Sequence, residues 1–407
     1  MRHEHFIAGC LIIVTVVVIV FIISLFSGCS TNNTHTKTQP NILWNKTYGG
    51  PGDDAGLSLV PTLDNGSVIT GYTRSYGNGS SDLWLVKIDA DGGVRWNRTY
   101  GGPGEDVGTS IAISPAGGYI IAGYTSPNES NIKKLWLIKT DLDGNLQWDT
   151  TYGESQGCKG VAVAGSDNNG YMVAGNIEKE GSTGLLLVKA DNNGTILWNK
   201  TYDTGFVWEG NAITTINGNE YVMTGAKIIE KQLRDLWIAK TDDTGSILWD
   251  KTFGGKGMDR GTSIIATKDK GYLVTGYTDT GPVYKLWLIK VDASGNQEWA
   301  KTFGSDGNGL DKSRYGTLGT VGESIVNTID GGYVIAGYSN AYTGSMELYV
   351  LKTNLSGDWE WSMHYGLLPY TAGYSVIETR DGNYMIAGET GQNGDLADLL
   401  VTKIAPP

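Results

Sequence analysis

The sequence predicts an all-β protein, a seven-bladed β-propeller built from four-stranded antiparallel blades. A segment of the form W-x-x-T-[Y/F]-G returns seven times, with Asp203 replacing the Gly in the fourth copy and His364 replacing the Thr in the last, and starts at Trp44, Trp96, Trp148, Trp198, Trp249, Trp299 and Trp361. Successive tryptophans are 50–52 residues apart, except for a last gap of 62. Each period contains several short apolar runs separated by turn residues, which is typical of one propeller blade per period.

The first unit defines the elements of a blade. Its four predicted strands cover residues 42–48, 56–60, 67–72 and 82–89. Each run is rich in β-branched and aromatic residues and is bounded by Gly, Asp, Asn or Ser, which are strand and turn signals. No helical periodicity follows residue 28, so we expect strands throughout the rest of the chain.

Two further positions repeat with the tryptophan. A Gly closes the third strand of every unit, at Gly71, Gly123, Gly175, Gly225, Gly276, Gly337 and Gly388. A Tyr precedes that Gly by four residues in six units, and Ser67 is the exception. Glycine inside a strand marks a close approach of backbones. We expect each Trp to dock between adjacent blades and to bury roughly 150–250 Å² there.

The turn and strand over residues 241–249 resemble the tryptophan-docking motif of quinoprotein-type propellers, in which an Asp leads into a turn Gly and a Trp follows four residues later. The same Gly-to-Trp spacing occurs at Gly92/Trp96, Gly144/Trp148, Gly194/Trp198 and Gly295/Trp299. The longer repeat is similar to that of archaeal and bacterial cell-surface propeller lipoproteins over about residues 41–405. This resemblance implies the fold and says little about activity, because fold does not fix function.

The two ends of the repeat array predict how the ring closes. The Trp strand opens the first unit, whereas the last unit ends at residues 399–404 with no Trp strand after it. By the resemblance, the Trp strand is the outermost strand of a blade. We therefore expect strand 41–48 to complete the blade built from residues 373–404, which removes two exposed sheet edges. An open ring without this exchange is the alternative.

The N-terminal segment predicts a membrane attachment. Residues 6–26 are almost continuously apolar, and Ser27-Gly28-Cys29 resembles a lipobox, so we expect an apolar leader over 1–28 and lipidation of Cys29. The run is also long enough to span a bilayer as an uncleaved anchor. Either interpretation places the propeller, residues 41–407, at the cell surface on the outer side of the cytoplasmic membrane. Residues 29–40 would be a flexible tether.

The composition limits the classes of molecule that the chain can bind. The net charge is −12, from 31 basic and 43 acidic residues, and basic runs are absent, so nucleic acid is excluded as a partner. Cys158 stands alone in the mature domain, so no internal disulfide is possible. We expect a monomer that binds an unknown cell-surface protein or polysaccharide. Nine N-x-[S/T] sequons indicate either glycosylation or a consensus of the repeat, at Asn32, Asn45, Asn65, Asn78, Asn97, Asn128, Asn193, Asn199 and Asn354.

The candidate ligand-binding residues lie in loops that join one blade to the next. In propellers these loops gather around one mouth of the channel. They contain Asp54, Asp106 and Asp259, and the repeat pattern breaks at Trp208 and Glu209. An expanded loop, 304–320, adds Asp306, Asp311, Arg314 and Tyr315. Departures from a repeat indicate binding, and neutral drift in exposed loops is the alternative.

Two other patterns are interpreted as structural. The turns that begin Asp89-x-Asp91-Gly92 and Asp141-x-Asp143-Gly144 resemble the start of a calcium loop, but no Glu completes an EF-hand, so tight hairpins are favoured. We expect no cofactor, with Ca²⁺ as the open alternative. A Lys near the end of the fourth strand in every unit is expected to pair with carboxylates between blades rather than to bind an anion.

No catalytic residues are predicted. A sialidase-type Asp-box places its Gly three residues before the Trp, whereas here the spacing is four. His364, the one histidine beyond the tether, is weak evidence for a general base. The sequence thus predicts a membrane-tethered binding or scaffold module and not an enzyme. The alternative is a surface carbohydrate-active or quinoprotein-like enzyme on the same fold.

Overall fold

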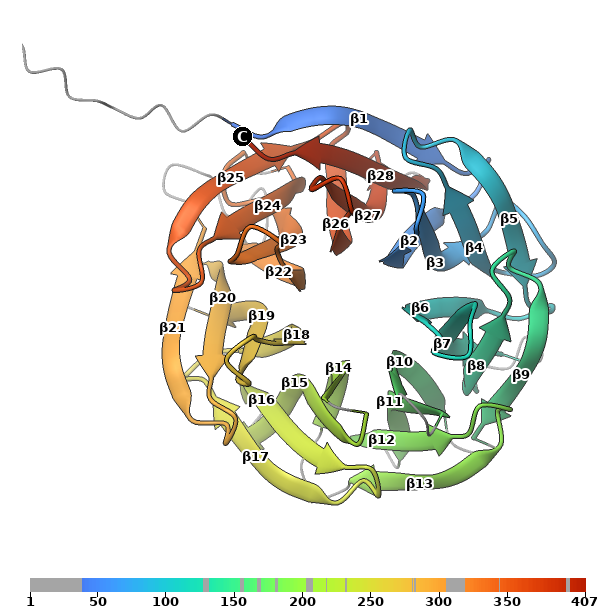
Figure 1. Cartoon of the computed structure of the whole chain (residues 1–407), viewed down its shortest axis with the longest axis horizontal. Coiled ribbons are helices and arrows are strands. Elements are labelled where there is room, and N and C mark those ends of the chain that lie inside the picture. The colour runs from blue at the N-terminus through green and yellow to red at the C-terminus, as the bar shows by residue number, and fades with distance from the viewer. Residues whose placement is uncertain are drawn as a thin grey trace, which may run out of the picture. The chain divides into compact units, whose positions relative to one another are not determined.

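A computed structural model describes residues 39–126, 132–153, 157–166, 170–179, 182–202, 208–216, 218–230, 233–279, 281, 283–304, 319–343, 345–392 and 396–407. These residues belong to one compact unit, Gln39–Pro407. Seven four-stranded antiparallel sheets form a ring around a central channel (Figure 1). Within the described residues all regular secondary structure is β-strand, as the sequence predicts. No helix long and apolar enough to cross a membrane occurs in this part of the chain.

The strands follow chain order from the channel outward in each blade. The innermost strands are β2 (Asp54–Pro61), β6 (Asp106–Ile113), β10 (Cys158–Ser166), β14 (Trp208–Ile216), β18 (Arg260–Ala266), β22 (Thr320–Asn327) and β26 (Tyr370–Glu378). The second strands are β3 (Ser67–Thr73), β7 (Tyr119–Thr125), β11 (Gly170–Lys179), β15 (Glu220–Glu230), β19 (Tyr272–Asp279), β23 (Tyr333–Ser339) and β27 (Tyr384–Gly391).

The outer half of each blade holds the tryptophans. The third strands are β4 (Asp82–Ile88), β8 (Lys134–Thr140), β12 (Ser182–Ala190), β16 (Leu233–Asp242), β20 (Tyr284–Val291), β24 (Glu347–Thr353) and β28 (Ala397–Ala405). The outermost strands are β1 (Asn41–Tyr48), β5 (Val94–Tyr100), β9 (Leu146–Tyr152), β13 (Ile196–Tyr202), β17 (Ile247–Phe253), β21 (Gln297–Phe303) and β25 (Trp359–Tyr365). Blades are numbered 1 to 7 from β2–β5 to β26–β28, and blade 7 takes β1 as its outer strand.

The ring closes as the sequence predicts. Strand β1 pairs antiparallel with β28, with Trp44 opposite Lys403 and Tyr48 opposite Leu399. The first and last segments of the propeller therefore share one sheet, and β28 does not become an exposed edge (Figure 1).

The second-strand glycine is explained by a bulge in the inner strand. In blade 1 the pairing register of β2 and β3 shifts between Gly56 and Ser58, so one extra residue stands on the inner strand. A Cβ on Gly71 would lie 1.9 Å from the carbonyl oxygen of Ala55. No side chain fits at that distance. The same register shift occurs in all seven inner strands.

Adjacent blades contact each other through the repeated tryptophans. A Cβ on the β8–β9 turn residue Gly144 would lie 2.7 Å from the indole of Trp96 in the preceding blade. The equivalent pairs are Trp44/Gly92, Trp148/Gly194, Trp198/Gly245, Trp249/Gly295 and Trp299/Gly357. Trp361 is the exception because blade 7 has no turn between its last two strands, and its ring centroid lies 6.1 Å from that of Tyr384 instead.

The repeated lysines are buried or half-buried and mostly paired with carboxylates, but not where we expected. Lys87, Lys240, Lys290, Lys352 and Lys403 pair with a carboxylate of their own blade. Only the pair of Lys189 and Asp243 joins two blades. Lys139 binds the backbone oxygens of Gly117 and Thr140 and the side-chain oxygen of Gln147. The expectation of pairing between blades was therefore wrong for most of them, since the loops of a lysine's own sheet are nearer.

Candidate functional site

The channel wall carries the position at which the blades differ most. In every inner strand the bulged residue follows a Gly and precedes a Ser or Ala, and the seven bulged residues are Leu57, Thr109, Val161, Asn211, Thr262, Glu323 and Tyr374. The flanking positions are constant because they form contacts between blades. Ser58, for example, accepts a hydrogen bond from the backbone N–H of Ile111 in the next blade at 3.3 Å. The bulged residue itself varies in type, and the structural contact it makes also differs from blade to blade.

Three bulged residues connect neighbouring blades. The hydroxyls of Thr109 and Thr262 donate to the carbonyls of Gly160 and Gly322 at 2.9 and 2.5 Å. The amide of Asn211 donates to the carbonyl of Gly261 at 2.7 Å. In each case the acceptor is the glycine before the bulge of the next blade. This contact requires a donor.

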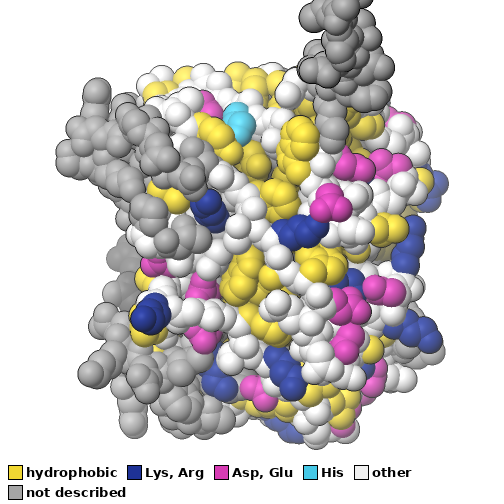
Figure 2. Space-filling model, turned by 90° about the vertical axis from the view of Figure 1, so that its left-hand side faces the viewer, with side chains coloured by type: hydrophobic (Ala, Val, Ile, Leu, Met, Phe, Trp, Pro, Cys, Tyr) yellow, Lys and Arg dark blue, Asp and Glu magenta, His cyan; other side chains and the backbone are white. Residues whose placement is uncertain are grey.

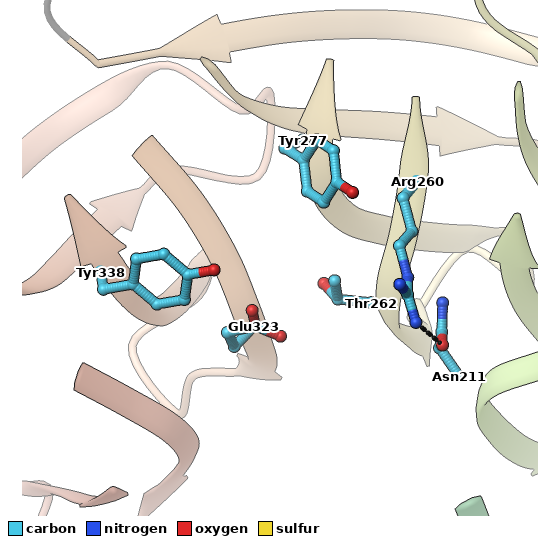
Figure 3. A pocket seen from close by; sticks show the side chains of 6 residues that line it. All are labelled: Asn211, Arg260, Thr262, Tyr277, Glu323 and Tyr338. Carbon is cyan, nitrogen blue, oxygen red and sulfur yellow. Dashed lines mark hydrogen bonds between the residues drawn. The ribbon is translucent and has the colours of Figure 1, made fainter. Parts of the chain in front are cut away.

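A polar pocket lies where three consecutive blades meet the channel. It has a volume of about 340 Å³ and is lined by Asn211, Arg260, Thr262, Tyr277, Glu323 and Tyr338, from blades 4, 5 and 6. Figure 3 shows Arg260 and Asn211 on one side of this space and Glu323 and Tyr338 on the other, with Thr262 and Tyr277 between them. The pocket is large enough for a small polar molecule or the tip of a larger one.

Arg260 is held in place by its own partners. Its Nη2 donates to Oδ1 of Asn211 at 2.6 Å, and its Nη1 lies 3.5 Å from Oε2 of Glu209. Glu209 is also 2.8 Å from Nη1 of Arg234. One carboxylate, Glu209, thus partly compensates two guanidinium groups on the arginine side of the pocket, and these three groups keep a net positive charge.

Glu323 stands on the other side without such compensation. Its side chain is half-buried, and it forms no hydrogen bond or ion pair with any residue that the structure describes. Burial raises the pKa of Glu323 to about 7, and the attraction of Arg260 offsets only part of this effect. Burial also raises the pKa of Tyr277 and Tyr338, so both hydroxyls stay neutral near physiological pH.

Other carboxylates around the same face have partners. Glu389 accepts hydrogen bonds from Tyr370 and Tyr374 at 2.7 and 2.6 Å. Glu105 accepts one from Tyr124 at 2.7 Å and lies 2.6 Å from Nζ of Lys133. Compared with these two acids, Glu323 is the exception. On the side of the ring shown in Figure 2, acidic and basic side chains are interspersed and form no patch of one sign.

The residues predicted from the sequence lie mostly elsewhere. Asp54, Asp106 and Asp259 are buried, and their carboxylates accept hydrogen bonds from backbone N–H groups four residues earlier, at 3.0, 2.8 and 3.0 Å. They hold the loops between blades and do not line the pocket. Glu209 lies beside the pocket. The side chain of Trp208 and the whole of Cys29, Asp306, Asp311, Arg314 and Tyr315 lie outside the described residues.

The acidic turns have the geometry of hairpins. Oδ1 of Asp89 accepts hydrogen bonds from the backbone N–H groups of Asp91 and Gly93, at 2.9 and 2.8 Å, and Asp141 repeats this pattern. This is the arrangement of an Asx turn. Among the described residues no group of three or more His, Cys, Asp or Glu side chains converges as a set of metal ligands. Calcium binding at these turns stays an untested alternative.

Comparisons with known proteins support the fold alone. No protein-family model and no curated protein matches the sequence. A protein of unknown function from Dyadobacter fermentans superposes with a TM-score of 0.51 at 10% identity, over 90% of this chain and 99% of that one. Sqt1 from Chaetomium thermophilum superposes with a TM-score of 0.45 at 11% identity, over 85% of this chain and 82% of that one. A neuraminidase-like protein of bat influenza subtype N11 covers 91% of this chain and 95% of its own, with a TM-score of 0.38 at 12% identity.

Sequence reasoning missed the residues that line the pocket, although the repeat contains a signal for them. Aligning the seven G-x-[S/A] segments exposes one variable position between two constant ones, and Asn211, Thr262 and Glu323 occupy it. Tyr277 and Tyr338 follow the second-strand glycine, where Tyr is common. Arg260 precedes the inner-strand glycine, a position that is also charged in blades 3 and 4, at Lys159 and Glu209. The loops drew attention because their lengths differ, whereas the channel residues differ only in type.

Proposed function

We propose that the chain is a membrane-tethered, extracytoplasmic β-propeller that serves as a binding module at the cell surface, and that its ligand enters the channel at the pocket of blades 4 to 6. One observation carries the proposal. The bulged channel residues vary while their neighbours are fixed by contacts between blades, and three of the variable residues converge in one polar pocket. Since Leu57 and Val161 occupy this position without a donor, the ring does not depend on one residue type there, and such a position can acquire binding specificity in a repeat scaffold.

The location at the cell surface rests on the sequence. The apolar run before Cys29 supports export and lipidation, and the Trp repeats support kinship with surface propellers that carry a tryptophan-docking motif. Labelling cells with a fatty-acid analogue tests the anchor. We expect the label on the wild-type chain and its loss in Cys29→Ser. Equal membrane association of an unlabelled Cys29→Ser protein would favour an uncleaved apolar helix instead.

The binding role is tested by retention of envelope components. Tagged residues 41–407 are incubated with envelope protein and polysaccharide fractions, with calcium or with a chelator. Arg260→Ala removes the arginine of the pocket. Arg95→Ala on the outer strand β5 is the charge-matched control, since Arg95 pairs only with Asp89 at the surface. We expect a component that Arg260→Ala loses and Arg95→Ala retains.

Three other results would redirect the proposal. Equal retention by both variants would place the binding surface outside the pocket. Release of oligosaccharides from the polysaccharide fraction would favour the enzyme alternative. If neither fraction retains anything, with calcium or without it, a purely structural role at the surface would be favoured. Sensitivity to the chelator would decide whether calcium takes part.

A further inference from the structure

The acid of the pocket occupies a position that supplies a hydrogen-bond donor to the next blade in three other blades. Glu323 is the bulged residue of β22, and its counterparts Thr109, Asn211 and Thr262 each donate to the carbonyl of the glycine before the next bulge. Above a pH of about 7 the carboxyl of Glu323 is mostly ionised, and the ionised form has no proton to donate and cannot make this contact. Glu323 therefore does not form the hydrogen bond between blades that this position forms in blades 2, 4 and 5.

No described cation forms an ion pair with Glu323, although Arg260 attracts it within the same pocket. Arg260 lines the same pocket, but its guanidinium is bound to Asn211 at 2.6 Å and shares Glu209 with Arg234. The pocket thus contains one carboxylate without an ion pair or hydrogen bond from the described residues. An uncompensated, half-buried charge is costly, and such a group lowers its free energy when a cation enters.

The surroundings of Glu323 suit a cation that carries several N–H donors. The hydroxyl groups of Tyr277 and Tyr338 border the same space, and each has lone pairs that accept a hydrogen bond (Figure 3). An ammonium group has three donors, and a carboxylate with two phenol oxygens matches that number. The volume of about 340 Å³ admits a sugar ring or the end of a lysine side chain.

We propose that this pocket binds a primary ammonium group, which pairs with the carboxylate of Glu323 and donates to the hydroxyls of Tyr277 and Tyr338. The inference rests on the proposed function and names the chemistry of its ligand. A primary amine at a cell surface comes from two sources, a free amino sugar or the lysine side chain of a protein. Both present the same group to Glu323.

Four probes test whether binding requires the positive charge of the amine and whether an amino sugar or a lysine side chain supplies it. Glucosamine represents the amino sugar, and Nα-acetyl-lysine amide represents the lysine side chain. N-acetylglucosamine and the Nα,Nε-diacetyl-lysine amide are their neutral counterparts. Affinity for residues 41–407 is measured by titration calorimetry at pH 7, where the amine of glucosamine is still largely protonated and about half of Glu323 is ionised. We expect acetylation of the amine to weaken binding about tenfold or more, since it removes the charge-assisted contact. The tighter of the two charged probes identifies the source.

Two pairs of variants test the residues. Glu323→Gln is expected to reduce amine affinity about tenfold or more, whereas Glu298→Gln on the outer strand β21 removes an equal charge and should leave it unchanged. Tyr338→Phe removes one acceptor, and Tyr124→Phe is its control at the same position of blade 2. Because Glu323→Gln removes a half-buried charge, we expect it to fold at least as well as the wild type, which thermal unfolding checks.

The pH dependence provides an independent readout. The groups that face Glu323 are Arg260 and the hydroxyls of Tyr277 and Tyr338, none of which changes charge near neutral pH. The affinity for Nα-acetyl-lysine amide, whose ammonium group stays protonated over this range, should therefore rise as pH increases through about 7, where Glu323 ionises, and the rise should be absent in Glu323→Gln.

Equal binding of charged and acetylated probes, or unchanged affinity in Glu323→Gln, would overturn the ammonium inference. So would the absence of measurable binding by both amines. The proposed function would survive each of these results if Arg260→Ala still abolished retention of an envelope component, because that experiment does not depend on ligand charge. If the ammonium inference failed and Arg260→Ala also retained every envelope component that the wild type retains, the pocket would not be the binding site.

Discussion

The contact between Trp96 and Gly144 is the sharpest test of how the blades hold together. Gly144 has a φ of +74°, and a Cβ there would lie 2.7 and 2.9 Å from two atoms of the Trp96 indole. Gly382, in the β26–β27 turn, has a φ of +75° and no atom within 4 Å of the same point. The two glycines share a backbone conformation and differ in their neighbours. Gly382→Ala therefore measures the backbone strain alone.

The expected magnitudes follow from these distances. A non-glycine residue in the left-handed region costs about 1–2 kcal/mol, which both substitutions incur. Carbon atoms pack at about 3.5–4.0 Å, so the indole must retreat by roughly 1 Å when Gly144 becomes Ala. The turn cannot move away freely, since the hydroxyl of Tyr100 donates to the carbonyl of Gly144. Overpacking of this kind costs about 1–3 kcal/mol, so Gly144→Ala should cost about 2–5 kcal/mol in total.

Urea unfolding followed by circular dichroism measures both variants, and Trp96→Ala completes a double-mutant cycle. With the indole removed, Gly144→Ala should cost no more than Gly382→Ala, which gives a coupling energy of about 1–3 kcal/mol. If Gly144→Ala proves no more destabilising than Gly382→Ala in the wild-type background, the indole does not confine this turn. The explanation of the repeated glycine would then be wrong.

Three further predictions concern the ring. Deleting residues 39–48 removes β1 and exposes the edge of β28, so we expect a lower melting temperature and concentration-dependent dimers in size-exclusion chromatography, and an unchanged monomer would contradict this. Gly71→Ala should abolish folding, as judged by circular dichroism, because its Cβ would lie 1.9 Å from the Ala55 carbonyl oxygen, and a native spectrum would refute the close approach. Burial, with a smaller effect from Asp106, raises the pKa of Asp82 from 3.8 to about 6. The folded state therefore takes up a proton before the unfolded chain does. Stability falls as pH rises from about 4 to 6 and stays reduced above it, so Asp82→Asn should raise the free energy of unfolding at pH 8 by up to about 3 kcal/mol. An unchanged pH profile would show that the carboxyl is not desolvated.

The fold was predictable from the sequence because each structural constraint is repeated seven times. One Trp is ambiguous, but a Trp with a turn Gly at fixed spacing in successive units reports a contact that every blade must make. Ring closure followed from the missing Trp strand at the C-terminus. The carboxylates that pair with the repeated lysines could not be predicted from the repeat. A lysine that repeats in sequence does not say which of several nearby acids it reaches, and Lys139 reaches none that is described.

The candidate site was missed because prediction from the sequence relied on repeated residues, which reveal the fold. A residue that repeats from blade to blade contributes to a contact that holds the ring together, whereas a binding residue can occupy a position that the ring does not restrict to one residue type. The loop residues Asp54, Asp106 and Asp259 recur in three blades, and recurrence turned out to reflect a shared structural task, the binding of loop N–H groups. Glu323 has no counterpart of its kind and does not make the hydrogen bond that this position makes in three other blades. Glu323 is therefore informative for function because its position connects blades in three other units, whereas its own carboxylate is left to line the pocket.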